Sequence, residues 1–220
     1  MAITREQILN RARGEIGVTE YPPNSNKVKY NNWYYGREVS GPDYKWCLTY
    51  VQWVYKDSGL LPSKTVSCSA LYNEFKKRGM LTNNPEGADL VFYKWSNSKY
   101  PCEHIGIYEA AKDGSHFYSI EGNTSTNGSQ DNGGAVLRRL RTKDKSVVAF
   151  VKLNFAETPA QGKPATTTTS NKKSVDEVAW EIIKGKGGWG NNPGRRQKLE
   201  AAGYNYNEVR DRVNQLLARK

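Results

Sequence analysis

Residues 45–60, KWCLTYVQWVYKDSGL, place a cysteine directly before a run with helical apolar spacing. Apolar residues recur at intervals of three and four from Leu48 to Tyr55, and Gly59 follows where a helix commonly ends. Cys47 is therefore expected at a helix N-terminus, where free backbone N–H groups and the helix dipole stabilise a thiolate. This stretch alone leaves two roles open for Cys47: a nucleophile, or a small apolar residue of the core.

The segments around this helix predict an α+β fold. Residues 4–17 and 68–78 have helical spacing, and residues 21–43 are expected to form a long ordered loop that leads into the cysteine. From Gly87 onwards the apolar pattern alternates. This alternation is typical of strands, which are predicted over residues 89–95, 104–110, 116–121, 135–140 and 146–153. Helices followed by an antiparallel meander predict helices packed on one face of a sheet.

The composition changes twice toward the C-terminus. Residues 157–170, ETPAQGKPATTTTS, lack the bulky apolar side chains that a core needs, so we expect a linker there. Beyond it, three segments predict short helices, and Ser174 with Glu177 forms a capping box at the first. The predicted organisation is a domain over residues 1–155, a linker over 156–173 and a three-helix bundle over 174–220.

Charge and hydropathy restrict the class of partner. The 220 residues carry a formal net charge of +11, which favours an anionic partner such as the acidic polymers of a bacterial wall. The basic clusters at residues 76–78 and 138–141 match no nucleic-acid motif and are expected to be solvated. No apolar run reaches the ~20 residues needed to span a bilayer. We expect a cytoplasmic monomer without a signal peptide and without nucleic-acid or membrane partners.

The cysteines and histidines indicate cysteine chemistry without a metal. Cys68 and Cys102 make neither a CxxC pair for zinc nor a disulfide framework with Cys47. A bridge between Cys68 and Cys102 stays open, although a reducing compartment favours free thiols. With two histidines and no acidic calcium loop, no metal or cofactor is predicted.

A base for Cys47 has to come from one of the two histidines. His104 begins a predicted strand, whereas His116 lies within the strand pattern and is expected to be structural. Glu121 ends the neighbouring strand, so it can meet His104 and Cys47 at one end of the sheet. A cysteine site needs such a base and a partner that orients the imidazole, as in the papain-type arrangement. Taken singly, the histidine also fits a core or surface role and the glutamate a solvated carboxylate.

Four motifs together resemble the CHAP family of cysteine- and histidine-dependent peptidoglycan amidohydrolases and peptidases. They are Trp46-Cys47 with Val51 and Trp53, GADLVFY from Gly87, HIGIYE from His104 and IEGN from Ile120, and the likeness covers about residues 1–154. It implies a papain-like domain with Cys47 as nucleophile, His104 as general base, Glu121 as orienting residue and Asn123 as a fourth polar member of that network. Glu86-Gly87-Ala88-Asp89 replaces the usual Pro-Gly-Asp turn, and the acidic loop of calcium-binding members is missing.

The C-terminal segment is similar to the choline-independent cell-wall-binding repeat of phage lysozymes. The likeness rests on Trp189-Gly190-Asn191, on Arg195 four residues before a leucine, and on AAGY at residues 201–204. It implies binding to the muropeptide part of peptidoglycan, with Trp189 stacked on a sugar, Arg195 paired with a carboxylate and Asn191 as a further binding residue. A core role for Trp189 is the alternative.

These resemblances predict a phage endolysin, held in the host cytoplasm and released to the wall through a membrane pore. It would cleave an amide bond of peptidoglycan, as an amidase or an endopeptidase, and Trp46 beside the nucleophile is expected to line the substrate groove. A non-catalytic wall-binding protein and a cysteine peptidase acting on protein are the alternatives.

Overall fold

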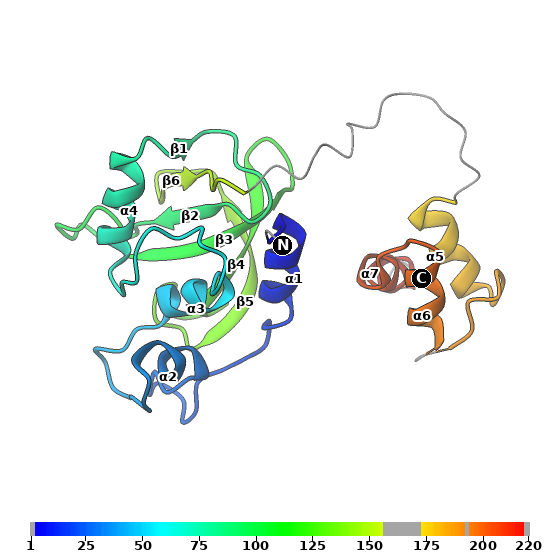
Figure 1. Ribbon diagram of the computed structural model, residues 1–220, viewed down its shortest axis with the longest axis horizontal. Helices are drawn as coiled ribbons and strands as arrows, with labels where there is room; N and C mark the ends of the chain where they lie inside the picture. Colours follow the sequence, from blue (N-terminus) through cyan, green and yellow to red (C-terminus); the bar gives the residue numbers. More distant parts are fainter. Residues whose placement is uncertain (1–2, 156–172, 192–193, 218–220) are drawn as a thin grey trace. The chain divides into compact units, whose positions relative to one another are not determined.

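The computed structural model describes residues 3–155, 173–191 and 194–217, and the chain divides into two compact units, Met1–Gln161 and Gly162–Lys220. Of the predicted linker, residues 156–172 lie outside the described residues. In the first unit (Figure 1) the helices are α1 Arg5–Arg13, α2 Lys29–Tyr35, α3 Cys47–Val54 and α4 Cys68–Lys77. Its strands are β1 Leu81–Thr82, β2 Leu90–Tyr93, β3 His104–Ala111, β4 His116–Thr124, β5 Ala135–Thr142 and β6 Val147–Val151.

The strands form one antiparallel sheet in the order β1-β6-β2-β3-β4-β5. Alternation along β3 separates its two faces: Ile105 and Ile107 join the core with the helices, whereas Tyr108 packs on the other face against Phe117 and Phe150. The predicted α+β class and all five predicted strands are confirmed. The two-residue β1 was not predicted, because so short a segment has no readable alternation.

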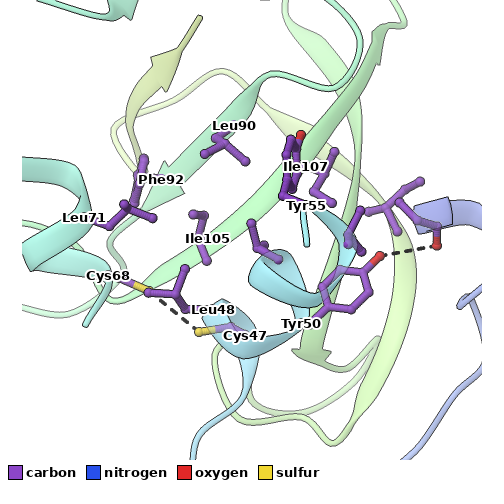
Figure 2. Close-up of a cluster of buried hydrophobic side chains, with 14 of the residues drawn as sticks. Cys47, Leu48, Tyr50, Tyr55, Cys68, Leu71, Leu90, Phe92, Ile105 and Ile107 are labelled. Atoms are coloured by element: carbon purple, nitrogen blue, oxygen red, sulfur yellow. Dashed lines mark hydrogen bonds between the residues drawn. The ribbon is translucent and has the colours of Figure 1, made fainter. Parts of the chain in front are cut away.

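Helix α3 is the centre of the larger core. Seven of its eight residues are buried, and it packs on β3 and β4, with residues of α1 and α4 in the same core (Figure 2). The Tyr50 hydroxyl donates to the Ala12 carbonyl at 3.3 Å and so ties α3 to α1. Burial of an aliphatic or aromatic side chain contributes about 1.5–3 kcal/mol. The helix therefore anchors its first residue, Cys47, firmly in the fold.

Two predictions are corrected, one on the end of a helix and one on a loop. Helix α3 ends at Val54 and not near Gly59: the backbone leaves the helical conformation at the C-cap Tyr55, and Asp57 beyond it is left-handed with a φ of 65°. The predicted loop over residues 21–43 contains α2, whose sequence KYNNWYY lacks a regular aliphatic spacing. Tertiary packing stabilises α2, since the Tyr30 ring lies against the rings of three aromatic residues, Trp46, Tyr50 and Trp53.

The second unit consists of the three predicted short helices, α5 Val175–Ile183, α6 Gly194–Ala201 and α7 Tyr206–Leu217. Each supplies one fully buried residue to a small core, which is formed by Val178, Leu199 and Val209. The predicted capping box of Ser174 and Glu177 is confirmed at the start of α5. Over the described residues of both units, no helix is long and apolar enough to cross a bilayer.

Gly122 allows α3 to approach β4 closely. A Cβ atom at this position would lie 2.6 Å from the Cβ of Tyr50 and 2.7 Å from its Cγ. Real Cβ atoms do not approach other carbons so closely, so a larger residue would push the helix away from the sheet. Close packing of α3, the helix that carries Cys47, therefore requires a glycine at position 122.

We expect Gly122→Ala to lower the free energy of unfolding of this unit by about 1–3 kcal/mol, because the added methyl group overpacks the contact with Tyr50. Thermal or urea denaturation measures the change. Gly114→Ala is the matched control, since its Cβ would meet nothing within 4 Å. Equal losses of stability in the two variants would contradict this account of the contact.

Candidate active site

Cys47 is the first residue of α3, as predicted. Its side chain is buried but lines a groove of about 660 Å³, together with Trp95, Tyr100 and the ion-paired Lys45 and Asp131. The sulfur therefore has a helix N-terminus behind it and a substrate-sized opening in front of it.

His104 and Glu121 meet inside the protein, on neighbouring strands of the sheet. Both side chains are fully buried, and His104 Nε2 lies 3.0 Å from Glu121 Oε2. Gly106 makes this approach possible, because a Cβ there would lie 2.7 Å from the Glu121 Cγ. Over the described residues the buried His104 Nδ1 has no hydrogen-bond partner of standard geometry, so it is the ring nitrogen available to the Cys47 sulfur.

The charges of this site favour a thiolate and an imidazolium. The pKa of the Cys47 thiol is well below its usual value, first because Cys68 hydrogen-bonds to its charged form and then because the nearby His104 stabilises that charge, and together they outweigh burial. Burial alone would lower the pKa of His104, but its contacts with Cys47 and Glu121 raise it to about 9. Near neutral pH the pair therefore consists of a nucleophilic sulfur and a proton donor.

Arg141 is a member of the site that the sequence did not reveal. Its guanidinium makes a bidentate ion pair with the Glu121 carboxylate, at 2.8 Å from Nε and 2.5 Å from Nη2. Burial would raise the pKa of Glu121, but Arg141 and His104 hold it well below its usual value. The Arg141 side chain is 11% exposed, so the prediction of a solvated cluster at residues 138–141 is wrong for this arginine.

A sequence signal for Arg141 does exist in the alternation of β5. Glu121 pairs with Leu137 in the register of β4 and β5, and residues two and four beyond Leu137 share its face of the sheet. One of them is Arg141. The sequence alone does not contain this register, because the two strands are joined by a long loop.

Asn123 is placed elsewhere than predicted. It has a left-handed φ of 57°, and its side chain accepts from the Gly134 N–H at 3.1 Å and donates to Asn132 at 3.0 Å and, more weakly, to Asn26 at 3.4 Å. The prediction that Asn123 joins the histidine–glutamate network is therefore wrong. Its hydrogen bonds instead hold the loop that connects β4 and β5.

The prediction that Trp46 lines the groove is also wrong. Its side chain is fully buried, its ring lies against Tyr30, and its indole N–H donates to the buried Glu20 carboxylate at 3.1 Å. The carboxylate supplies the acceptor that a buried indole needs, which directs the ring inward. Trp95 is the tryptophan of the groove. It is 38% exposed and lies 5.5 Å from the His104 ring.

In the second unit, Trp189 packs against the small core. Its indole N–H donates to Glu181 at 2.9 Å, and its ring meets the ring of Tyr204 edge to face. The structure thus gives this residue the packing role that the sequence left as the alternative. Stacking of Trp189 on a sugar stays a prediction.

Asn191 and Arg195 lie together at the start of α6. The Arg195 guanidinium donates to the Gly190 carbonyl at 2.7 Å and to the Asn191 side chain at 3.1 Å. These contacts hold the arginine near the surface of the Gly-Trp-Gly-Asn turn. Recognition of a carboxylate by this pair stays a prediction.

Comparison with known families assigns both units. Residues 39–123 match the CHAP domain model, and residues 176–217 match the CW_7 repeat model. The chain carries a CHAP domain followed by a CW_7 repeat. A CHAP domain indicates a cysteine- and histidine-dependent amidohydrolase or peptidase with peptidoglycan as substrate, and a CW_7 repeat indicates binding to the cell wall.

The crystal structure of Ly7917 is similar to this chain at 17% sequence identity and a TM-score of 0.41. The match covers 69% of this chain and 63% of the length of that one. No curated protein matches the sequence.

The CHAP match ends at residue 123, so it includes Cys47, His104 and Glu121 but not Arg141. Across the described residues, no group of three or more His, Cys, Asp or Glu side chains is arranged to hold a metal ion. The buried Glu121 carboxylate of this CHAP domain has two cationic partners, His104 inside the matched segment and Arg141 beyond it.

We expect Arg141→Met to destabilise the CHAP domain by about 3–5 kcal/mol at neutral pH, because it leaves the Glu121 charge buried without its main partner. Chemical denaturation monitored by tryptophan fluorescence gives the measurement. The loss should shrink on acidification, since a protonated Glu121 needs no cation.

Arg138→Met provides the control for this prediction. Arg138 belongs to the same strand and pairs with the buried Glu109, but Glu109 keeps a second ion pair with Arg13 at 2.7 Å. A cost below about 1 kcal/mol is expected for this variant. Our account of Arg141 is wrong if both variants lose the same stability.

Proposed function

We propose that this protein is an endolysin whose CHAP domain hydrolyses an amide bond of bacterial peptidoglycan through a thioester on Cys47. The observation that carries the proposal is the arrangement of Cys47, His104 and Glu121. The thiol has a lowered pKa and opens onto a groove, while a histidine and a carboxylate at 3.0 Å are buried behind it. This is the constellation that nucleophilic amide hydrolysis requires.

The proposed reaction begins with attack of the Cys47 thiolate on the amide carbonyl carbon. The negative charge passes to the carbonyl oxygen, where the free backbone N–H of the first helical residue can stabilise it. The His104 imidazolium then gives its proton to the amine, which leaves as the C–N bond breaks and the thioester forms. Water attacks the thioester, His104 accepts a proton from it, and the thiolate is released with a carboxylic acid product.

Glu121 keeps this imidazole in one orientation. The carboxylate contacts Nε2, which leaves Nδ1 toward the sulfur and stabilises the charged ring. Arg141 in turn fixes the carboxylate through two hydrogen bonds. The groove next to Cys47 presents the accessible rings of Trp95 and Tyr100. Such rings can pack against the apolar faces of sugars and against the stem peptides of peptidoglycan.

The CW_7 repeat is proposed to hold the enzyme on its substrate. A tethered wall-binding unit raises the effective concentration of the CHAP domain at the wall, even when the affinity of a single repeat is low. The net charge of +11 adds attraction to the acidic polymers of the wall. Release of the protein from a host cytoplasm through a membrane pore remains part of the endolysin proposal.

Cys47→Ala and His104→Ala should each lower the hydrolysis of purified cell walls by about 10³-fold or more, because each removes a group that bonds or transfers a proton in the reaction. Loss of turbidity of wall suspensions measures the rate, and mass spectrometry of the released fragments identifies the bond. New amino groups paired with muramic acid carboxyls would indicate an amidase, and new peptide termini an endopeptidase.

His116→Ala is the control for these variants, since the His116 side chain is partly exposed and makes its hydrogen bonds to the nearby loop residues Asp113 and Ser115. It should keep the full rate. Both inactive variants should still sediment with the walls. The proposal is refuted if Cys47→Ala digests walls at the normal rate, or if the protein cleaves casein and leaves walls intact.

The pH dependence of hydrolysis should be bell-shaped. On the alkaline side the rate should fall near pH 9, because the pKa of His104 is about 9 and the neutral ring cannot protonate the leaving amine. On the acid side the rate should fall only at a pH below the usual pKa of a thiol, because the lowered pKa keeps Cys47 ionised down to that pH. Glu121→Gln should move the alkaline limb to lower pH, since the carboxylate raises the pKa of His104.

Initial rates of wall hydrolysis, at constant ionic strength between about pH 4 and 10, measure this profile. A flat profile across the alkaline range, or a shift of the Glu121→Gln limb to higher pH, would contradict the assigned charges.

A further inference from the structure

A second cysteine lies against the proposed nucleophile. Cys68 is the first residue of α4, and its sulfur is 3.8 Å from the Cys47 sulfur (Figure 2). The two residues come from different helices, each with its first turn at the groove. The sequence did not predict this contact, because it offered Cys102 as the partner of Cys68. All three cysteines are free thiols in the structure.

The direction of this hydrogen bond follows from the charges. The pKa of Cys68 is raised well above its usual value, first by the contact with Cys47 and then by burial, so Cys68 keeps its proton. The pKa of Cys47 is lowered, with the hydrogen bond from Cys68 as the largest cause. A thiol beside a thiolate can only donate to it. Hydrogen bonds to charged groups are stronger than those between neutral partners.

The other groups around the Cys47 sulfur do not replace this donor. His104 approaches from β3 and supplies the opposite charge, and the backbone N–H of Leu48 contributes from α3 itself. Cys102 lies farther along the groove, where its sulfur contacts the Ser69 hydroxyl at 4.0 Å. The remaining charged groups of the groove are Glu103, which is bonded to Ser96 and Ser98, and the Lys45–Asp131 ion pair.

We propose that Cys68 is a positioning residue for the nucleophile: its thiol donates a hydrogen bond to the Cys47 thiolate and holds the sulfur at the opening of the groove. The proposal rests on the proposed function only for the role of Cys47. Cys68 acts through Cys47 and does not itself contact the substrate in this proposal.

The first test measures the reactivity of Cys47 without any substrate. The full-length protein is treated with iodoacetamide between about pH 5 and 9 and digested with trypsin, and alkylation is followed by mass spectrometry. Cys47, Cys68 and Cys102 fall on separate tryptic peptides, residues 46–56, 65–76 and 100–112. The rate for each thiol is therefore read independently.

Cys68→Ala should slow the alkylation of Cys47 at pH 6 about tenfold, because the thiolate loses a charge-assisted hydrogen bond and its pKa rises. Cys68→Ser should recover most of the rate, since the hydroxyl is also a donor. Cys102→Ser, the matched control in the same groove, should leave the Cys47 profile unchanged. An unchanged profile in Cys68→Ala, or an equal effect of Cys102→Ser, would overturn the proposal.

The second test probes the contact itself with diamide, a thiol-specific oxidant. The two thiols lose two protons and two electrons to form a disulfide, and the diazene is reduced to the hydrazine. We expect residues 46–56 to become linked to residues 65–76, with full reversal by dithiothreitol. A link between residues 65–76 and 100–112 in place of this product would refute the contact between Cys47 and Cys68.

The two proposals fail in different ways. If Cys68→Ala leaves the Cys47 reactivity unchanged while Cys47→Ala abolishes wall hydrolysis, the role of Cys68 is wrong and the proposed function stands. If Cys68→Ala slows alkylation as expected but walls are never hydrolysed, the contact stands and the proposed function is wrong.

Discussion

The charge of Glu121 is the constraint on which the CHAP domain depends. A fully buried carboxylate is tolerated only with partners, and here His104 and Arg141 supply them from the strands on either side. The same pairing that makes the burial tolerable also determines the chemistry. It orients the imidazole and raises the pKa of His104, so that the charged ring stabilises the Cys47 thiolate. Stability and reactivity in this domain therefore share one ion-pair network, in which a change to any member alters both.

Helix α3 connects that network to the core. Its apolar side chains pack on the sheet, Gly122 lets it approach β4 closely, and its first residue is Cys47, the proposed nucleophile. The cysteine therefore needs no dedicated loop for its placement. The opposite wall of the groove comes from the first turn of α4, so two helix starts converge on one opening. Their backbone N–H groups make this end of the domain favourable for negative charge.

The features that could be predicted from the sequence are those that depend on the pattern of neighbouring residues along the chain. Apolar spacing located α3 and α4, alternation located the five long strands, and the order of Cys47, His104 and Glu121 suggested one site. The structure brings these three together as expected. The features that were missed depend on contacts between distant segments. Arg141 depends on the register of β4 and β5, Cys68 on the approach of two helices, and the inward turn of Trp46 on a buried Glu20 that no motif contains.

The position of Arg141 has a consequence for recombining this domain with others. The segment that matches the CHAP family stops at residue 123, within β4. Arg141, whose positive charge pairs with Glu121, lies on the next strand, β5. A graft cut at the boundary of the recognisable segment would transfer the cysteine, the histidine and the carboxylate, yet leave the carboxylate's counter-charge behind. Such a chimera would depend on its new host strand for an arginine in the same register. Modular exchange of this domain is therefore limited by β5, a strand that lies beyond the matched segment.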